Sequence, residues 1–538
     1  MLDNDSLLQI FSYYRLKHED NWNIRFMWRN LIHVSRRWRY LIFDWRSHLD
    51  ICLLLTHDSP SLYTLSHLPP LPLVIDYSDR TRTITRKDDD NIHLGLQQHG
   101  HVHQVSLRAP ASGLCMLLEP MDKDFPRLEN LSLLSTTIEE VNPMLLETFQ
   151  APNLRCLTLH GVGLPKGLPL LSSAMALSTL ILTHIGAYCY FPPRDLVTQI
   201  QGLPQLEELS IGFAIPIPLP SSQQELLSPP IPPVSLPSLR QLTFWGVDIY
   251  LDNFVAQINT PLLERLSLTL RFDLTFSLVN LTEFIRRTEG FRSLVASVIF
   301  KKGGPSIDAG HHEQGGLGKL NLHVNCEPLD WQIDSATQVC SALANVVSAV
   351  EALTLDLDVD GMASDWADTL DSLFWHELLL PFIGVKKLHI GSSLTVELSQ
   401  ALRSAAGGLA LELLPDLQEL HIAHSRNLHV QEIDHAKDAL FTFVEIRESV
   451  GRHVHLSTPS SWAAKPEVTP KTPRTVVQVP RSAVQVPRAA VQVHHIDLTA
   501  VDYVNRPYRN QTIKLIGLCR TCILTQRQTL RSYEELRR

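Results

Sequence analysis

The sequence has little of what marks a secreted or membrane protein. It holds 8 cysteines among 538 residues, which is too few and too scattered for a disulfide scaffold. No uninterrupted apolar stretch reaches the roughly eighteen residues that a spanning helix needs. The start, "MLDNDSLLQIF", has acids where a secretory signal carries basic residues. We therefore expect a soluble, reduced protein of the cytoplasm or nucleus, with no membrane contact.

An excess of basic charge is also missing. Lysine and arginine number 47 against 56 aspartates and glutamates, a net charge of −9, which is the wrong sign for a surface that binds phosphates. We expect no nucleic-acid partner. With 44% hydrophobic residues, the chain can bury a large interior, and its length exceeds one ordinary domain unless it is a repeat array.

Motifs for catalysis or cofactor binding are scarce. Neither HExxH nor Gly-x-Ser-x-Gly occurs. His99, His101 and His103 have strand spacing and could hold a metal, but freely titrating histidines are the simpler interpretation. Cys519 and Cys522 form a CxxC without a second pair. We expect no catalytic residue, no cofactor and no metal, although an enzyme site assembled from dispersed residues would leave no such motif.

A basic stretch with two tryptophans, "LIHVSRRWRYLIFDW" at 31–45, predicts one amphipathic helix. Its face-forming positions recur at offsets 0, 3, 4, 7, 10, 11 and 14. Trp38 lies on this face. Arg36, Arg37 and Arg39 lie mostly on the other side, as charges on a packed surface helix do. A helix that grips nucleic acid is the alternative interpretation, but no coherent basic stripe accompanies these arginines.

A shorter helix is predicted upstream, in "DNDSLLQIFSYY". Asp3 or Asp5 can accept hydrogen bonds from its first free amide groups. The two helices carry more apolar surface than about fifty residues can bury by themselves. A partner or the following domain is therefore expected to cover them.

These two segments resemble the F-box, whose usual pattern is Leu-Pro, a few polar residues, a Leu-Leu-x-Ile-Phe helix and a Val-x-x-x-Trp helix. The later stretches "LPPLPLVIDYSD", "LDWQIDSATQVCSAL" and "LLPDLQELHI" are similar to the F-box proteins that basidiomycete fungi carry in large numbers, over the chain to about residue 456. Asp3 stands where the family usually has proline. The resemblance implies that the Skp adaptor of a Skp–cullin–F-box ubiquitin ligase is bound by Leu2, Leu7, Leu8, Ile10, Phe11, Leu31, Val34, Trp38 and Leu41.

The middle of the chain carries a repeat of the form apolar-x-x-apolar-x-apolar. Copies such as "LENLSL" and "LQELHI" begin at 102, 128, 154, 177, 206, 239, 263, 317, 350, 385 and 417. The intervals of 23 to 35 residues, with one of 54, are those of leucine-rich repeats. In such repeats the alternating part is a short parallel strand, and a helix or loop returns the chain. The Gly-rich stretch 301–319 in the long interval is expected to loop out or to divide the array.

The variable positions inside each unit are expected to point out of the exposed side of the sheet. They are polar and mixed in sign, which suits protein recognition better than nucleic-acid binding. The candidates for substrate contact are Glu129, Arg155, Glu207, Glu208, Arg240, Lys386, Lys387 and Gln418.

The expected fold class is α/β, a helical F-box followed by an irregular leucine-rich-repeat solenoid and a disordered C-terminal tail. The expected parts are an F-box module at 1–50, a linker at 51–100, the solenoid at 101–456, and a low-complexity tail at 457–538 with proline-interrupted heptads at 475–495. By resemblance, the chain is a non-enzymatic adaptor that brings an unidentified protein substrate to a cullin ligase. A repeat-based binding protein no longer coupled to a ligase is the alternative.

Overall fold

The structure, a computed structural model, describes part of the chain. The described residues are 3–16, 31–45, 52–59, 71–119, 121–137, 146, 148–163, 169–214, 232–271, 278–288, 291, 295–310, 318–326, 328–358, 372–404, 413–423 and 430–458. All belong to the first of two compact units, Met1–Lys465 and Pro466–Arg538. The tail heptads and the CxxC lie outside the described residues. None of the described helices is long and apolar enough to cross a membrane.

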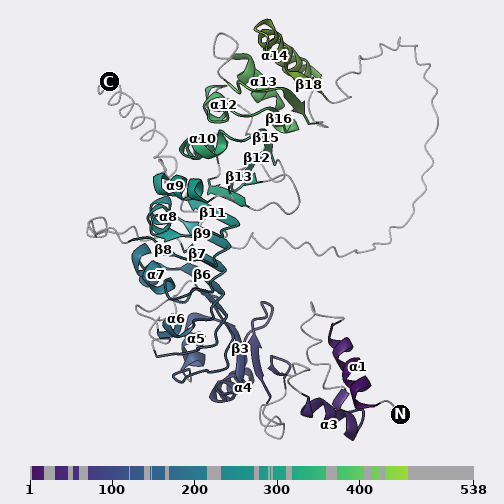
Figure 1. The fold of residues 1–538 in the computed structure, drawn as a ribbon, viewed down its shortest axis with the longest axis vertical. Helices are drawn as coiled ribbons and strands as arrows, with labels where there is room; N and C mark the ends of the chain where they lie inside the picture. The colour runs from purple at the N-terminus through teal and green to yellow at the C-terminus, as the bar shows by residue number, and fades with distance from the viewer. Residues whose placement is uncertain are drawn as a thin grey trace, which may run out of the picture. The chain divides into compact units, whose positions relative to one another are not determined.

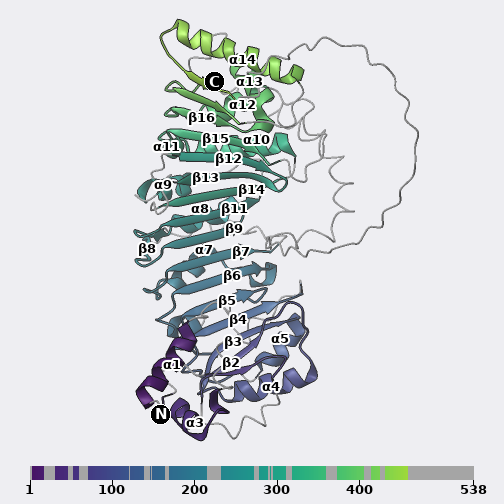
Figure 2. The ribbon, with the colours of Figure 1, turned by 90° about the vertical axis from the view of Figure 1, so that its right-hand side faces the viewer.

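One sheet of 16 described strands runs through the first unit (Figures 1 and 2). In spatial order the strands are β1 (Leu53–Leu55), β2 (Leu73–Tyr77), β3 (Val102–Ala109), β4 (Asn130–Ser135), β5 (Cys156–His160), β6 (Thr179–Ile185), β7 (Glu208–Phe213), β9 (Gln241–Gly246), β11 (Arg265–Arg271), β14 (Lys319–Asn325), β13 (Gly304–Gly310), β12 (Val295–Lys301), β15 (Ala352–Leu357), β16 (Lys387–Ile390), β17 (Glu419–Ile422) and β18 (His455–Ser457). Two shorter strands, β8 (Val234–Ser235) and β10 (Ile258–Asn259), pair separately. Each of the eleven repeat units contains one strand of the large sheet, as predicted.

Helices return the chain along one side of this sheet (Figure 1). They are α4 (Arg86–Gln97), α5 (Ala111–Leu118), α6 (Pro169–Ser173), η4 (Ala187–Cys189), α7 (Pro193–Ile200), α8 (Asp248–Val255), α9 (Val279–Arg287), α10 (Leu329–Ala342), α11 (Ala344–Val347), α12 (Ser372–Leu379), η7 (Ser392–Leu394), α13 (Thr395–Ser404) and α14 (Val430–Ser449). Each described unit is thus a short strand with a helical or irregular return, the architecture of an irregular leucine-rich-repeat solenoid.

The alternation within each unit explains the core. In β5, Leu157 and Leu159 are fully buried, while the alternating residues Cys156 and Thr158 are half-buried on the opposite face. The leucines of neighbouring strands form one continuous apolar cluster along the sheet. Because burying one leucine side chain contributes about 1.5–3 kcal/mol, each unit is stable only when stacked on its neighbours.

The segment expected to be a linker, 51–100, belongs to the sheet instead. β1 pairs in parallel with β2, and β2 pairs in parallel with β3. Both strands are short apolar runs without the leucine spacing of the other units. The solenoid therefore begins near Leu53, about fifty residues earlier than the repeat pattern indicates.

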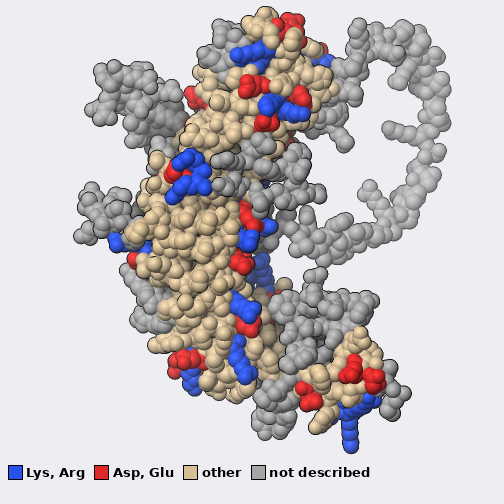
Figure 3. All heavy atoms as spheres, in the orientation of Figure 1, with Lys and Arg blue, Asp and Glu red and all other residues tan. Residues whose placement is uncertain are grey.

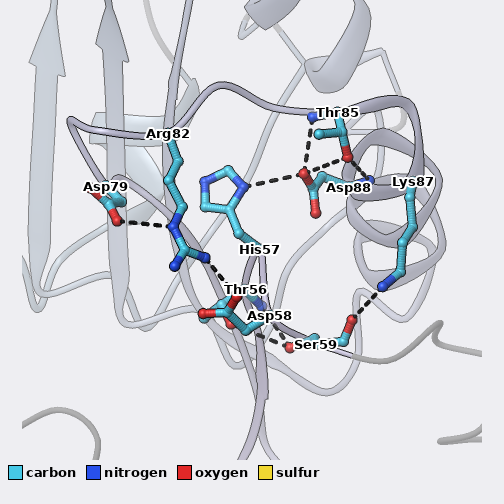
Figure 4. A network of polar contacts seen from close by, with 9 residues as sticks. All are labelled: Thr56, His57, Asp58, Ser59, Asp79, Arg82, Thr85, Lys87 and Asp88. Carbon is cyan, nitrogen blue, oxygen red and sulfur yellow. Dashed lines mark hydrogen bonds and ion pairs between the residues drawn. The ribbon is translucent and has the colours of Figure 1, made fainter.

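Buried polar contacts tie the loop after β1 to the N-terminus of α4 (Figure 4). Asp88 Oδ2 lies 3.2 Å from His57 Nδ1 and accepts hydrogen bonds from the amide and hydroxyl of Thr85. Burial by itself would raise the pKa of Asp88, but the hydrogen bonds from Thr85 and His57 outweigh it and lower that pKa. The side chains of His57 and Asp88 are only 9% and 4% exposed, so this pair acts as a structural tie.

The Gly-rich stretch within the long interval forms part of the sheet, contrary to expectation. Its first half is β13, which pairs antiparallel with both β12 and β14. Gly304 has a φ of +130°, and a Cβ there would lie 1.8 Å from the carbonyl oxygen of Val324, so only glycine fits. β14 then pairs in parallel with β11. The array is therefore continuous through this hairpin, and residues 311–317 lie outside the described part.

Candidate functional site

The first candidate site is the two-helix module formed by α1 (Asn4–Leu16) and α3 (Arg36–Asp44). Phe11 and Trp38 pack edge to face, with ring centroids 5.0 Å apart. Arg37 donates two hydrogen bonds to Asn4 Oδ1, at 3.1 and 2.7 Å. The contacts between these two described helices thus include one aromatic pair and one polar pair.

Asp3, at the position where the F-box usually has proline, caps α1. Its Oδ1 accepts a hydrogen bond of 2.7 Å from the amide of Ser6. This bond is the main reason why the pKa of Asp3 lies below its ordinary value. Aspartate thus supports the start of α1 by capping it, in place of the preorganised backbone of a proline.

The single helix expected over 31–45 is broken at Ser35, which is extended with φ −158° and ψ 161°. Ser35 Oγ accepts the amide of Trp38 at 3.1 Å, so Ser35 is the N-cap of α3. The helical face predicted over 31–45 is therefore wrong at Val34 and Trp45, which are 59% and 39% exposed. Arg36, Arg37 and Arg39 are exposed, as expected.

The structure sorts the residues expected to bind Skp into three groups. Leu7, Phe11 and Leu41 are buried in the chain itself. Leu8, Leu31 and Trp38 are half-buried, and Ile10 and Val34 are exposed. Leu2 lies outside the described residues. Tyr40, which is 77% exposed, joins this exposed apolar set. The sequence pattern does not single it out, because it lies among the arginines.

The second candidate site is the face of the sheet opposite the buried leucines, called the open face below. The strand register aligns its side chains into rows that cross the strands. A first row contains Gln104, Asn130, Cys156, Thr179, Glu208, Gln241, Arg265 and Lys319. A second row contains Ser106, Ser132, Thr158, Ile181, Ser210, Thr243, Ser267 and Asn321. Most members of the second row are small and polar, so that row forms a flat floor.

The candidates for substrate contact lie at one margin of this face. Glu208 and Lys387 are the first residues of β7 and β16. The others directly precede a strand and are called the rim: Glu129, Arg155, Glu207, Arg240, Lys386 and Gln418. The second row, and residues such as Trp245 one step further along the strands, were missed. The second row is the variable position between the second and third apolar residues of each unit, and Trp245 directly follows the third one. The alternation of the strand could therefore have identified both.

Several of these candidates are already paired with charges on the neighbouring strand. Arg240 forms an ion pair with Glu264. Lys386 Nζ lies 2.7 Å from Glu351 Oε1, and Lys387 Nζ lies 3.1 Å from Glu419 Oε1. Figure 3 shows acidic and basic side chains close together along the sheet side, beside an area over α7 and α8 with few charges. Surface pairs of this kind contribute only about 0–1 kcal/mol each, and they leave these side chains less available to a partner.

Histidines also meet on the open face. The rings of His160 and His184 stack 5.1 Å apart, and those of His389 and His421 stack 4.6 Å apart. Burial, with help from His184 and Arg108, lowers the pKa of His160. Among the described residues, which include His99, His101 and His103, no group of three or more histidine, cysteine or acidic side chains could hold a metal ion.

Comparison with known proteins finds likeness in structure alone. No protein-family model and no curated protein matches the chain. Among solved structures, it is similar to the leucine-rich repeat-containing protein LegL7 from Legionella pneumophila, with 11% sequence identity and a TM-score of 0.24, over 72% of this chain and 97% of that one.

Proposed function

We propose that this chain is the substrate-recognition subunit of a Skp–cullin–F-box ubiquitin ligase, acting in the cytoplasm or nucleus. In this proposal α1 and α3 bind the Skp adaptor, and the open face binds a protein substrate. The chain then needs no catalytic residue, because the recruited ubiquitin-conjugating enzyme supplies the chemistry.

The observation that carries the first half of this proposal, Skp binding and so the link to the ligase (the ligase half), is the exposed apolar surface of the two-helix module. Ile10, Val34 and Tyr40 are 47%, 59% and 77% exposed. Phe11 and Trp38 pack against each other inside the module, so the exposed side chains are the ones available to a partner. Large apolar side chains exposed on a small module are candidates for a protein interface. The F-box resemblance names Skp as that partner.

The substrate half is supported by the composition of the open face. It combines hydroxyl and amide side chains with one large aromatic side chain, Trp245, near the middle of the strand order. Protein interfaces favour aromatic residues within a polar surround. A surface for nucleic acid would instead carry a continuous basic stripe, and the rim charges here are of both signs.

Affinity purification of the full-length chain with a Skp subunit tests the ligase half. The double variant Ile10→Asp, Val34→Asp changes only exposed side chains, so it should keep the wild-type melting temperature and lose Skp. Met116→Asp is the matched control, because Met116 is 60% exposed on α5, outside the module, and should retain Skp.

If the wild-type chain retains no Skp, the ligase half is wrong. The chain is then a repeat-based binding protein without a ligase. The departure at Asp3, where the F-box usually has proline, is the observation that favours this second candidate.

A further inference from the structure

We infer that the middle of the open face, around Arg265, Lys319 and Trp245, binds an extended acidic polypeptide segment that carries an apolar side chain about four residues from its acidic group. This inference deepens the substrate half of the proposed function and rests on it. It is independent of Skp binding.

Arg265 and Lys319 are two adjacent cations without a partner in the described structure. They are aligned in the parallel register of β11 and β14, which places their Cα atoms about 4.8 Å apart. Both side chains are exposed, and neither forms a hydrogen bond or ion pair with another described residue. An arriving carboxylate would relieve the repulsion between these two charges, whereas a basic segment would increase it.

The acidic side chains near this pair are already engaged. Glu264 bonds Arg240, and Glu208 accepts a hydrogen bond of 3.4 Å from Gln241. On the other side, Asp308 accepts a hydrogen bond from Asn321. Arg265 and Lys319 thus have no acidic partner among the described residues, which sets this part of the open face apart from the paired cations Arg240, Lys386 and Lys387.

Trp245 supplies the apolar end of the site. It is half-buried and aligned with Thr269 of β11, four residues from Arg265 and therefore about 13 Å away along the strand. The missing side chain of Gly212 leaves room beside the indole, since a Cβ there would lie 3.6 Å from Trp245 Cε3. An extended segment advances about 3.3 Å per residue, so an acidic residue and an apolar residue four positions apart span both ends.

The floor between these ends can accommodate an extended backbone. Thr243 and Ser267 lie side by side in the second row, followed by Asn321. These side chains are short and carry hydroxyl or amide groups that can bond to main-chain amides and carbonyls. The surface therefore offers charge at one end, hydrogen bonds in the middle and an aromatic ring at the other end.

The test measures fluorescence anisotropy of labelled peptides with the full-length chain. The probe is a Ser/Gly peptide with a Glu-Glu pair and a phenylalanine four residues away, made in both orders. Its companions replace glutamate by glutamine, replace phenylalanine by serine, or double the spacing. We expect the probe in one order to bind more tightly than the glutamine peptide by about tenfold or more at low salt, with the difference shrinking at high salt.

Matched variants locate the binding. The double variant Arg265→Glu, Lys319→Glu should weaken the binding of the probe peptide by about tenfold or more. Lys386→Glu with Lys387→Glu makes the same change in net charge on cations that are already paired, and should change the affinity less than about threefold. Trp245→Ala should abolish the preference for phenylalanine and keep the preference for glutamate. The melting temperature of each variant is measured as a control for folding.

Three results would overturn the inference: equal binding of the glutamate and glutamine peptides, equal effects of the two charge-reversed pairs, or no binding of any peptide. Equal binding of both peptides that is lost in Trp245→Ala would leave the open face as a binding surface and reject only its acidic preference. Loss of Skp in the separate purification bears on the ligase half and leaves this inference standing.

Discussion

Replacing Trp38 with alanine is the most direct test of how the N-terminal module holds together. The indole packs edge-on against Phe11 at 5.0 Å and is half-buried. The backbone amide of residue 38 donates to Ser35 Oγ, and alanine keeps that bond. The substitution therefore removes packing without removing the N-cap of α3.

The magnitude follows from this partial burial. A fully buried tryptophan costs about 3–5 kcal/mol when truncated to alanine, so a half-buried one costs about 1.5–2.5. Loss of the edge-to-face pair adds about 0.5–1.5 kcal/mol. We expect a total of about 2–4 kcal/mol, which is a large share of the stability of a small helical module. Phe11 belongs to the same buried cluster as the solenoid leucines, with Trp38 packed against it. The repeats from β5 to β11 bury their own leucines between neighbouring strands, so they should stay folded.

Hydrogen exchange measured by mass spectrometry can read the two regions separately. In Trp38→Ala, amides of α1 and α3 should lose protection, while those of β5 to β11 keep it. Arg36→Ala is the control and should change stability by less than about 0.5 kcal/mol, because its side chain is exposed. Arg37→Ala should cost about 1 kcal/mol, because it loses its bonds to Asn4. Unchanged protection of α1 in Trp38→Ala would refute this account of the module.

Three further predictions concern the solenoid and the tail. Arg447→Met should destabilise the C-terminal end by about 1–3 kcal/mol in urea unfolding, because the fully buried guanidinium donates to the carbonyls of Leu413, Leu414 and Pro415, which methionine leaves unsatisfied; equal stability would contradict this. Asp88→Asn should destabilise the chain at neutral pH. Because the folded-state pKa of Asp88 is lowered, its stabilisation is present above about pH 4 and lost as pH falls through that pKa, so wild type and variant should converge in acid. Deleting the chain after Lys465, where the first compact unit ends, should leave the melting temperature nearly unchanged; a drop of more than a few degrees would show that the tail packs on the repeats.

The sequence by itself determined the repeating strand. In each unit, three apolar residues at fixed spacing face one side, and this local period identifies a strand whatever lies far away in the chain. All eleven units are strands for this reason. The start of α1 was equally local, since Asp3 needs only the amide of Ser6 three residues on.

Only the tertiary structure decided which strands and charges meet. β1 and β2 lack the leucine spacing, and only their parallel pairing with each other and with β3 shows that they belong to the sheet. The hairpin of β12 and β13 inserts between β14 and β15, an order that no local pattern contains.

The ion pairs on the open face also depend on the stacking of repeats. Arg240 meets Glu264 at a separation of 24 residues, and Lys386 meets Glu351 at a separation of 35. Arg265 and Lys319 lie side by side because β14 returns to β11 after that hairpin. Register between distant strands is set by the packing of the buried leucines, and that packing determines which surface charges find partners and which are left for another molecule.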